Sequence, residues 1–448
     1  MATTQALPDA LPRSVGLPHA TALNMLHMVG IGPFITMPLL LATMGGPQAM
    51  VGWVLGALVA FADGLIWAEL GAALPGSGGP YLYLREAFGS HTFGRLLAFV
   101  FIWQIVLTAP LSLAAGCVGF ADYAARVVPI GLGARPWVAA GAAGVCVVLL
   151  YRNISKTRLV SYALWGGLMA VVAILIAVGL PHAHWANLRF TAWPHGRDGF
   201  LRLGAATRYA MYDYAGYWTV NYFAAEVRDP VRTIPRCILW SVAGVAVLYL
   251  VMNTIIVAVL PLNVAMHSTA VVTDLMLQVA GPRAALAMTL LILALTLASL
   301  YSALLGYSRV PYAAAQDGNF FRLFRHLHPR EQFPDYSLLL IGLLAAAASI
   351  FSLSHLIEYL LVLQILMKFL PQIAAQVALR RRPGFPLPFK MWLYPLPAIV
   401  ALAGWSYIAV TANKGAVGVG LLLTIAGVGA FLLRARYHRE WPFETVDG

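Results

Sequence analysis

The sequence predicts an all-α membrane protein with about twelve transmembrane helices. Of its 448 residues, 60% are hydrophobic and only 10% are charged, whereas a soluble protein carries about a quarter charged residues. Apolar runs recur along the whole chain with short polar segments between them, and each run is near the length that a tilted transmembrane helix needs. These two observations exclude a soluble globular fold.

The expected spans lie near residues 22–44, 49–74, 93–125, 134–151, 159–180, 200–225, 235–260, 283–312, 335–353, 356–379, 391–411 and 416–434. Basic residues concentrate in the connections that are cytoplasmic if the N-terminus is cytoplasmic, as the positive-inside rule requires. An even number of spans then places both termini in the cytoplasm, and we expect an integral protein of the plasma (inner) membrane. The net charge of +12 is explained by this topology, and no nucleic-acid partner is expected.

The first span is poorly suited to form a continuous helix. Its middle reads Gly30-Ile31-Gly32-Pro33, where Pro33 has no N–H to give Val29 and the glycines lower the cost of leaving helical geometry. Freed backbone groups are costly in lipid unless protein or a water-filled cavity satisfies them. The segment is therefore either a simple kink, since Gly and Pro are common in membrane helices, or a binding device.

The sixth span has a second weak point, because Gly216 falls near its middle among aromatic residues and close to Asp213. Corresponding interruptions in two halves of a chain indicate inverted repeats with a substrate bound between them. An ionisable residue is energetically costly inside a membrane span, so its presence there favours a functional role. We expect Asp213 either to contact a substrate or a coupling proton, or to pair with Arg208, which lies about one turn away.

Signals for other classes of protein are missing from the sequence. Cys117, Cys146 and Cys237 lie in or next to apolar segments at no metal-binding spacing, so neither disulfides nor a metal site is expected. The polar, Pro-rich first twenty residues do not read as a cleavable signal peptide. No nucleophile elbow, His-Glu-x-x-His motif or phosphate loop occurs, and we expect no enzyme activity and no cofactor.

Several motifs together carry a resemblance to a known family. They are Ala68–Pro75 with Gly78, Gly79 and Tyr81; Tyr214–Gly216 with Asn221; Glu226–Pro230 with Ile234–Arg236; and Ser308–Arg309 with Asp317–Gly318. With Gly30–Pro33, in this order and spacing, the chain resembles the amino acid–polyamine–organocation transporter family over nearly its whole length. The resemblance implies a LeuT-like fold: a 5+5 inverted repeat, broken first and sixth helices, and two extra C-terminal helices.

The resemblance also implies a division of the chain and a function. The expected parts are an N-terminal tail (1–20), two repeats (21–180 and 181–380), two further spans (381–436) and a C-terminal tail (437–448). The implied function is a permease that moves amino acids by alternating access. Two alternatives stay open: a polyamine carrier, favoured if Asp63, Asp213 and Glu358 converge on one cavity, and a transport-dead nutrient sensor.

The resemblance places the substrate where the unwound first and sixth helices meet. An amino acid's carboxylate would bind the free N–H groups around Ile31, Gly32 and Phe34, at the positive end of the following half-helix. Its amino group would bind carbonyls freed near Val29 or in the segment 212–216. The expected substrate-binding residues are Val29, Gly30, Ile31, Gly32, Phe34, Asp213, Tyr214, Ala215, Gly216 and Tyr217.

Four residues are candidates for a coupling or ion site: His27, Ser299, Ser302 and Lys368. Each also has an ordinary structural interpretation, namely a packed histidine, serines that hold helices together, and a lysine that pairs with a neighbouring helix. Several members of the family have a proton-responsive lysine in the fifth helix, whereas this chain has Gly166 or Gly167 in that place. The proton remains the candidate coupling ion, but not through that residue.

Overall fold

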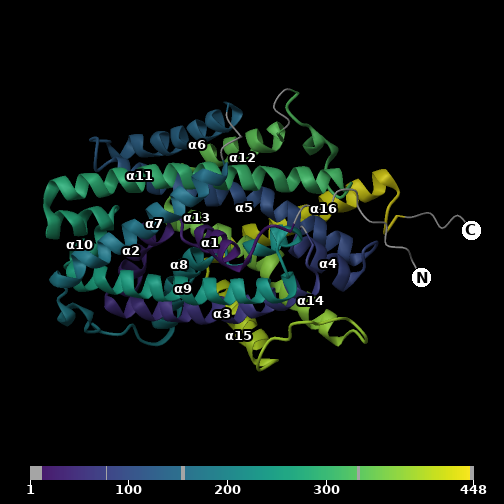
Figure 1. The fold of residues 1–448 in the computed structure, drawn as a ribbon, viewed down its shortest axis with the longest axis horizontal. Coiled ribbons are helices and arrows are strands. Elements are labelled where there is room, and N and C mark those ends of the chain that lie inside the picture. The colour runs from purple at the N-terminus through teal and green to yellow at the C-terminus, as the bar shows by residue number, and fades with distance from the viewer. Residues whose placement is uncertain (1–12, 77, 153–156, 330–332, 444–448) are drawn as a thin grey trace, which may run out of the picture.

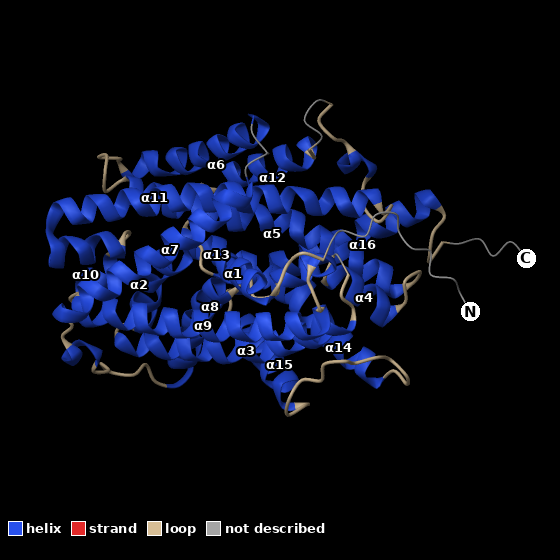
Figure 2. Cartoon of the chain, viewed as in Figure 1, coloured by secondary structure: helices blue, strands red, loops and turns tan. Residues whose placement is uncertain are grey.

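The computed structural model describes residues 13–76, 78–152, 157–329 and 333–443, and within these ranges the regular secondary structure is helical (Figures 1 and 2). In chain order the α-helices are α1 (Leu17–Met28), α2 (Gly32–Met44), α3 (Met50–Ala73), α4 (Pro80–Phe88), α5 (Phe93–Ala124), α6 (Arg135–Arg152), α7 (Thr157–Gly179), α8 (Gly196–Tyr214), α9 (Pro230–Val259), α10 (Leu262–His267), α11 (Val271–Gln316), α12 (Asp335–Ala348), α13 (Leu353–Gln364), α14 (Leu370–Arg381), α15 (Leu396–Val410) and α16 (Lys414–His438). Two shorter segments matter below: the 3₁₀ helix η5 (Thr219–Glu226) and the π-helical segment η7 (Ile365–Phe369).

Helical structure lies in each of the expected spans. Among the described residues, eight helices are long and apolar enough to cross a membrane, or nine if α1 and α2 form one bent span. Helices α12 and α15 are shorter apolar helices, and α8 continues into η5 after an interruption. The all-helical membrane fold is therefore confirmed, while the number of twelve spans stays a prediction.

One helix differs in detail from the expectation. Helix α11 is 46 residues long because it continues a short helix across a kink at Gly281, whose φ of +83° is non-helical. The expected span at 283–312 is the part that follows this kink.

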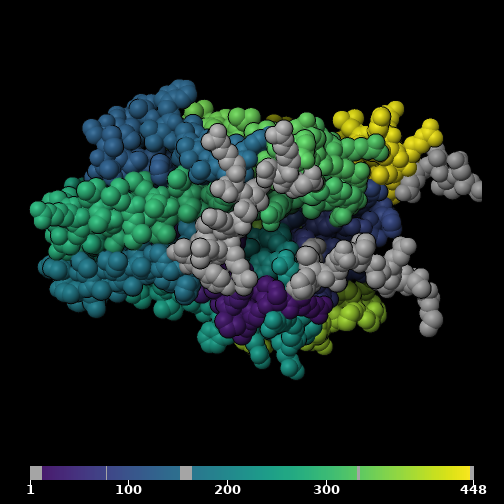
Figure 3. Space-filling model, turned by 45° about the horizontal axis from the view of Figure 1, so that its top comes forward, coloured from purple at the N-terminus to yellow at the C-terminus, as the bar shows by residue number. Residues whose placement is uncertain are grey.

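The buried side chains form two main clusters. One lies around α1, α3, α8 and α9, and the other around α5, α6, α11 and α12. In the first cluster α3 comes very close to α8, because a Cβ at Gly52 would lie 3.0 Å from the Cβ of Ala206, and one at Gly56 equally close to that of Ala210. Figure 3 shows the N-terminal segment (purple) at the surface of one face, with residues near the C-terminus (yellow) at one end. The interrupted spans are thus held by their neighbours on a closely packed scaffold.

A buried carboxylate ties α3 to α14 at the end of the bundle where α4 lies (Figure 1). Glu69 is fully buried and lies 3.0 Å from the guanidinium of Arg380. It also accepts hydrogen bonds from the Gln376 amide at 2.7 Å and from the backbone N–H of Met391 at 2.6 Å. The charge of Glu69 is therefore balanced by Arg380 and further stabilised by two hydrogen-bond donors, which is the condition for a stable buried ion pair.

We expect Glu69→Gln to destabilise the protein, because it leaves the largely buried Arg380 without its counter-charge. Breaking a buried pair from one side costs about 3–5 kcal/mol, so thermal unfolding in detergent should occur at a clearly lower temperature. Glu86→Gln is the matched control, since Glu86 and Arg382 form a pair that is about half exposed and worth at most about 1 kcal/mol. Equal melting temperatures for the two variants would contradict this account of Glu69.

Candidate functional site

Both predicted interruptions are present. Helix α1 ends at Met28, α2 begins at Gly32, and the two axes differ by 46°. Helix α8 ends at Tyr214, and Gly216 takes a φ of +118° before the chain continues as η5. That φ is open to glycine and strained for other residues, and Pro33 cannot supply the hydrogen bond that would continue α1 into α2. The sequence therefore dictates both breaks locally.

The two breaks contact each other through their main chains. A Cβ at Gly216 would lie 2.7 Å from the carbonyl oxygen of His27, so no side chain fits between the segments. The fully buried Asn24 of α1 spans the contact. Its amide donates to the Tyr217 carbonyl at 2.8 Å, and its side-chain oxygen accepts from the Val220 N–H at 3.0 Å. Asn24 thus replaces helical hydrogen bonds that the sixth span lacks, a role that we did not predict.

The hydroxyl group of Tyr249 on α9 contacts the C-terminal ends of both α1 and α8. It lies 2.9 Å from the carbonyl oxygen of Met28 and 3.3 Å from that of Asp213. The Tyr249 ring packs against Trp53 and Tyr214, with ring centroids 5.3 and 5.4 Å apart. A rigid aromatic support therefore fixes the positions of α1 and α8 relative to each other.

Several main-chain groups at the breaks have no partner within the described part of the chain. The N–H groups of Ile31 and Gly32 find no acceptor, whereas the N–H of Phe34 donates to the Ile31 carbonyl at 3.0 Å. The expectation that Phe34 offers a free donor is therefore wrong, because the first turn of α2 uses it. The carbonyls of Val29, Gly30, Tyr214 and Ala215 accept no hydrogen bond from any described residue. The breaks thus present donors and acceptors to a ligand.

Asp213 lies at the beginning of α2. The residue is 1% exposed, its Oδ2 accepts a hydrogen bond from the Thr36 hydroxyl, and its Oδ1 has no partner among the described residues. A Cβ at Gly32 would overlap this carboxylate, so the glycine is required for the close approach. The carboxylate keeps one free oxygen next to the free N–H groups of the first break.

The alternative that Asp213 pairs with Arg208 is wrong. Arg208 lies 3.0 Å from Glu358 on α13, and the two side chains are only 6% and 13% exposed. Five residues along a helix correspond to a rotation of about 140° relative to the starting face, so Arg208 and Asp213 point to different neighbours. Glu358 also accepts a hydrogen bond from the backbone N–H of Asn413 at 2.8 Å.

A small cavity of about 20 Å³ lies between the first break, α7 and α11. Its lining includes Gly30, Thr296 and Ser299, and the hydroxyl of Ser299 lies 3.9 Å from the place of a Cβ on Gly30. This volume is enough for about one water molecule. Thr296 was not predicted, although it precedes Ser299 by three residues and so lies on the same helix face.

The other coupling candidates lie elsewhere. Ser302 is not among the residues that line this cavity. His27 is exposed, and its ring nitrogen lies 2.9 Å from the carbonyl oxygen of Leu23, one turn earlier in α1. Lys368 lies in η7, where its ammonium group is 3.1 Å from the ring centroid of Trp218. The four candidates thus do not form a single site.

Tyr217 points toward α3 and α15 and not toward α2. Its hydroxyl group donates to Asp63 at 2.6 Å. Asp63 also accepts from the indole N–H groups of Trp67 at 2.8 Å and Trp405 at 3.2 Å. Of the residues expected to bind substrate, Tyr217 therefore contributes its backbone to the break and its side chain to the scaffold.

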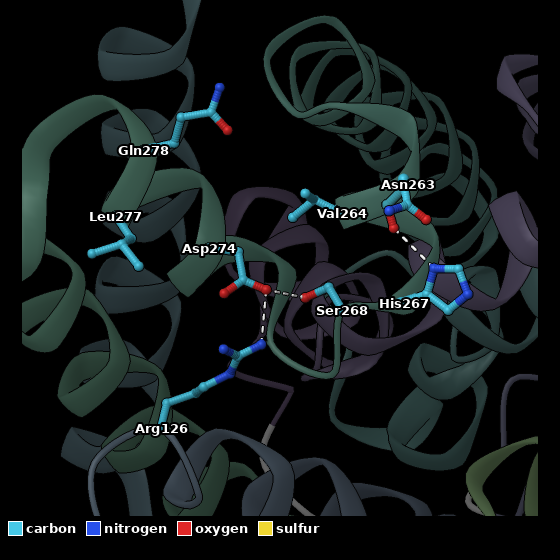
Figure 4. A pocket seen from close by; sticks show the side chains of 8 residues that line it. All are labelled: Arg126, Asn263, Val264, His267, Ser268, Asp274, Leu277 and Gln278. Carbon is cyan, nitrogen blue, oxygen red and sulfur yellow. Dashed lines mark hydrogen bonds and ion pairs between the residues drawn. The ribbon is translucent and has the colours of Figure 1, made fainter.

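The larger groove on the surface, of about 720 Å³, lies by α10 and the start of α11, at the end of the bundle opposite α4 (Figures 1 and 4). Its charged residues are paired with each other, since Arg126 lies 2.8 Å from Asp274, and Asp274 accepts from Ser268 at 2.6 Å. His267 is bonded to the Asn263 carbonyl. Because these polar groups satisfy one another, we assign the candidate binding site to the two breaks instead.

Comparison with known proteins identifies the family of this chain. The protein-family model described as amino acid permease matches residues 15–431. The chain is 27% identical to the Asc-type amino acid transporter 1 of Mus musculus, over 95% of this chain and 81% of the relative. It is 25% identical to the human cystine/glutamate transporter, over 94% and 85%, and 24% identical to the methylthioribose transporter of Bacillus subtilis, over 97% and 96%.

We expect Gly32→Ala to abolish substrate binding at the breaks while the protein still inserts and purifies, because the new methyl group overlaps the Asp213 carboxylate. Gly141→Ala in α6 is the matched control, since a Cβ there meets no atom within 4 Å. Binding is measured on purified protein by the shift of its melting temperature with added amino acids. An unchanged shift in Gly32→Ala would remove the functional role that we give to this contact.

Proposed function

This chain belongs to the amino acid permease family, and we propose that it is a secondary transporter that moves amino acids across the membrane by alternating access. The proposed substrate site lies between the breaks of the first and sixth spans. One observation supports this above all: main-chain N–H and C=O groups from both breaks, without a partner among the described residues, lie beside a buried carboxylate whose second oxygen is likewise free. Such a set of groups has no structural use in a membrane helix, where unsatisfied backbone is unfavourable.

The free groups fit a zwitterion. A carboxylate would accept hydrogen bonds from the N–H groups of Ile31 and Gly32, where the dipole of α2 adds favourable potential. An ammonium group would bind the free oxygen of Asp213 in a charge-assisted hydrogen bond, with the carbonyls of Tyr214 and Ala215 as further acceptors. The substrate ammonium would then lie between two negative groups, its own carboxylate and that of Asp213.

A polyamine is the less favoured substrate because the carboxylates do not converge. Asp63 bonds to Tyr217 and two indoles, Glu358 pairs with Arg208, and Asp213 bonds to Thr36. A chain of ammonium groups needs several free carboxylates along one cavity, whereas in the described part of the chain one free carboxylate oxygen lies at the breaks. The names of the Asc-type and cystine/glutamate relatives, which describe amino acid transporters, support the same choice.

Alternating access needs closures on both sides of the site, and two buried ion pairs are suited to this role. Arg208–Glu358 joins α8 to α13 five residues before Asp213, on the side of the break away from η5. Glu69–Arg380 joins α3 to α14 toward the end of the bundle where α4 lies. We propose that these pairs close opposite ends in turn, within the twelve-span 5+5 repeat architecture and with both termini in the cytoplasm.

The direct test is a counterflow assay in proteoliposomes that contain the purified full chain. Liposomes preloaded with one unlabelled amino acid are diluted into the same amino acid in radiolabelled form, and the assay is repeated across the common amino acids and with putrescine and spermidine. We expect exchange of amino acids and none of polyamines. Exchange of polyamines alone would establish the second candidate, and a fully stable protein that exchanges neither would point to a sensor.

We expect Asp213→Asn to raise the KM for exchange by about tenfold or more, because a hydrogen bond to a charged group contributes about 1.5–3 kcal/mol. Asp198→Asn on the same helix is the control, since Asp198 forms an exposed pair with Arg202. The comparison is made by counterflow at varied substrate concentration. A KM in Asp213→Asn equal to that of the control would show that this carboxylate does not contact the substrate.

A further inference from the structure

A second polar cluster lies against the sixth-span break, next to Tyr217 and Trp218. We call it the lysine cage and define it as Lys368 with Asp63, Trp67, Trp218 and Phe369. Lys368 is 3% exposed. Its ammonium nitrogen lies 3.1 Å from the ring centroid of Trp218, 5.1 Å from that of Phe369 and 5.5 Å from that of Trp67. The cation is therefore surrounded by aromatic faces, which attract it electrostatically.

The helix geometry around Lys368 is unusual. Residues Ile365–Phe369 form a π-helical segment inside an otherwise α-helical span, and such segments occur frequently at functional sites. Phe369, the last residue of this segment, stacks on Trp405 with ring centroids 3.8 Å apart. One turn later the amide of the buried Gln372 has no partner among the described residues. The tenth span thus carries polar groups in its interior that its own packing does not use.

Lys368 makes no hydrogen bond or close ion pair with any residue that the structure describes. Asp63 on α3 interacts with it electrostatically, and the phenol group of Tyr217 faces the cage through its bond to Asp63. The α5 and α16 side chains that pack beside this segment, Val100, Leu423 and Val428, are apolar. Glu69, further along α3, is occupied by Arg380. Asp63 is therefore the counter-charge of Lys368.

The lysine cage directly contacts the break in the sixth span. Tyr217 and Trp218 are the two residues after Gly216, so the cage holds the segment that follows the positive-φ turn. The carbonyl of Tyr217 also accepts the hydrogen bond from Asn24 of α1. Any change in how firmly Trp218 and Tyr217 are held is thus transmitted to both breaks.

We propose that Lys368 and Asp63 form the proton-binding site that couples transport to a proton gradient, a role that rests on the transporter function proposed above. The protonated ammonium is attracted to the Trp218 ring and to the Asp63 carboxylate, whereas the neutral amine loses both attractions. Binding of a proton therefore strengthens the attraction between the tenth span and the break in the sixth span, and release of the proton weakens it. A ligand shifts a conformational equilibrium by such differential binding. The proton binds from one aqueous side and is released to the other, and no other bond forms or breaks.

The test separates coupling from substrate exchange in the same proteoliposomes. Accumulation of a radiolabelled amino acid is measured with an inward proton gradient, and counterflow is measured at equal pH on both sides. We expect Lys368→Met and Asp63→Asn to reduce gradient-driven accumulation by about tenfold or more, within the usual range of coupling strengths, while counterflow changes by no more than about threefold. Lys414→Met, which removes an exposed lysine at the start of α16, should leave both unchanged.

Lys368→Arg distinguishes a proton site from a merely structural cation. Arginine keeps the positive charge and the attraction to the rings but does not release its proton in proteins. A structural role predicts that Lys368→Arg restores gradient-driven accumulation, and our proposal predicts that it does not. Accumulation retained in either lysine variant would overturn the proposal, and so would loss of counterflow in both.

The wild-type protein separates this proposal from the proposed function. Counterflow without any response to a proton gradient would overturn the coupling site and leave the transporter function standing. Absence of counterflow for every amino acid would instead overturn the transporter function.

Discussion

The contact between the two interrupted main chains is the constraint on which the rest of the structure depends. In lipid a free N–H or C=O group costs several kcal/mol, so a break in one helix is stable only if something else bonds to it. Here much of that support comes from the other break: Gly216 lies directly on the His27 carbonyl, and Asn24 bonds to the carbonyl of Tyr217 and the N–H of Val220. Neither break could exist at this place without the other.

The buried ionisable groups divide into those that are satisfied and those that are not. Glu69 has three partners, Glu358 has Arg208 and a backbone N–H, and Asp63 has three donors. Among the described residues, Asp213 keeps one free oxygen, Lys368 has ring faces and the charge of Asp63 as its neighbours, and two guanidinium nitrogens of Arg208 have no partner. Because unsatisfied buried charge is strongly unfavourable, a ligand or a proton gains most by binding at such incomplete groups, and of these Asp213 and Lys368 lie at the breaks.

The features that could be predicted from the sequence are those that the local chain dictates. Glycine and proline in 30–33 and Gly216 specify where the helices break, and hydropathy specifies where helices lie. Partners across the bundle could not be predicted in this way, because Arg208 reaches Glu358 and Tyr217 reaches Asp63 through packing that no local pattern encodes. The same holds for Asn24 and Thr36, which read as ordinary polar residues in an apolar helix until their neighbours are known.

The position of the lysine cage gives the sixth-span break two different neighbours. Asp213, before Gly216, faces the start of α2, and Tyr217 and Trp218, after it, face α3 and the tenth span. A glycine with positive φ lies between them, and such a residue is a natural pivot because its backbone has the widest choice of conformations. In the proposed coupling, tightening at the cage would be relieved by rotation at Gly216, which would move the carbonyls of Tyr214 and Ala215. These carbonyls are the acceptors proposed for a substrate ammonium, so proton binding at the cage would change the affinity of the substrate site.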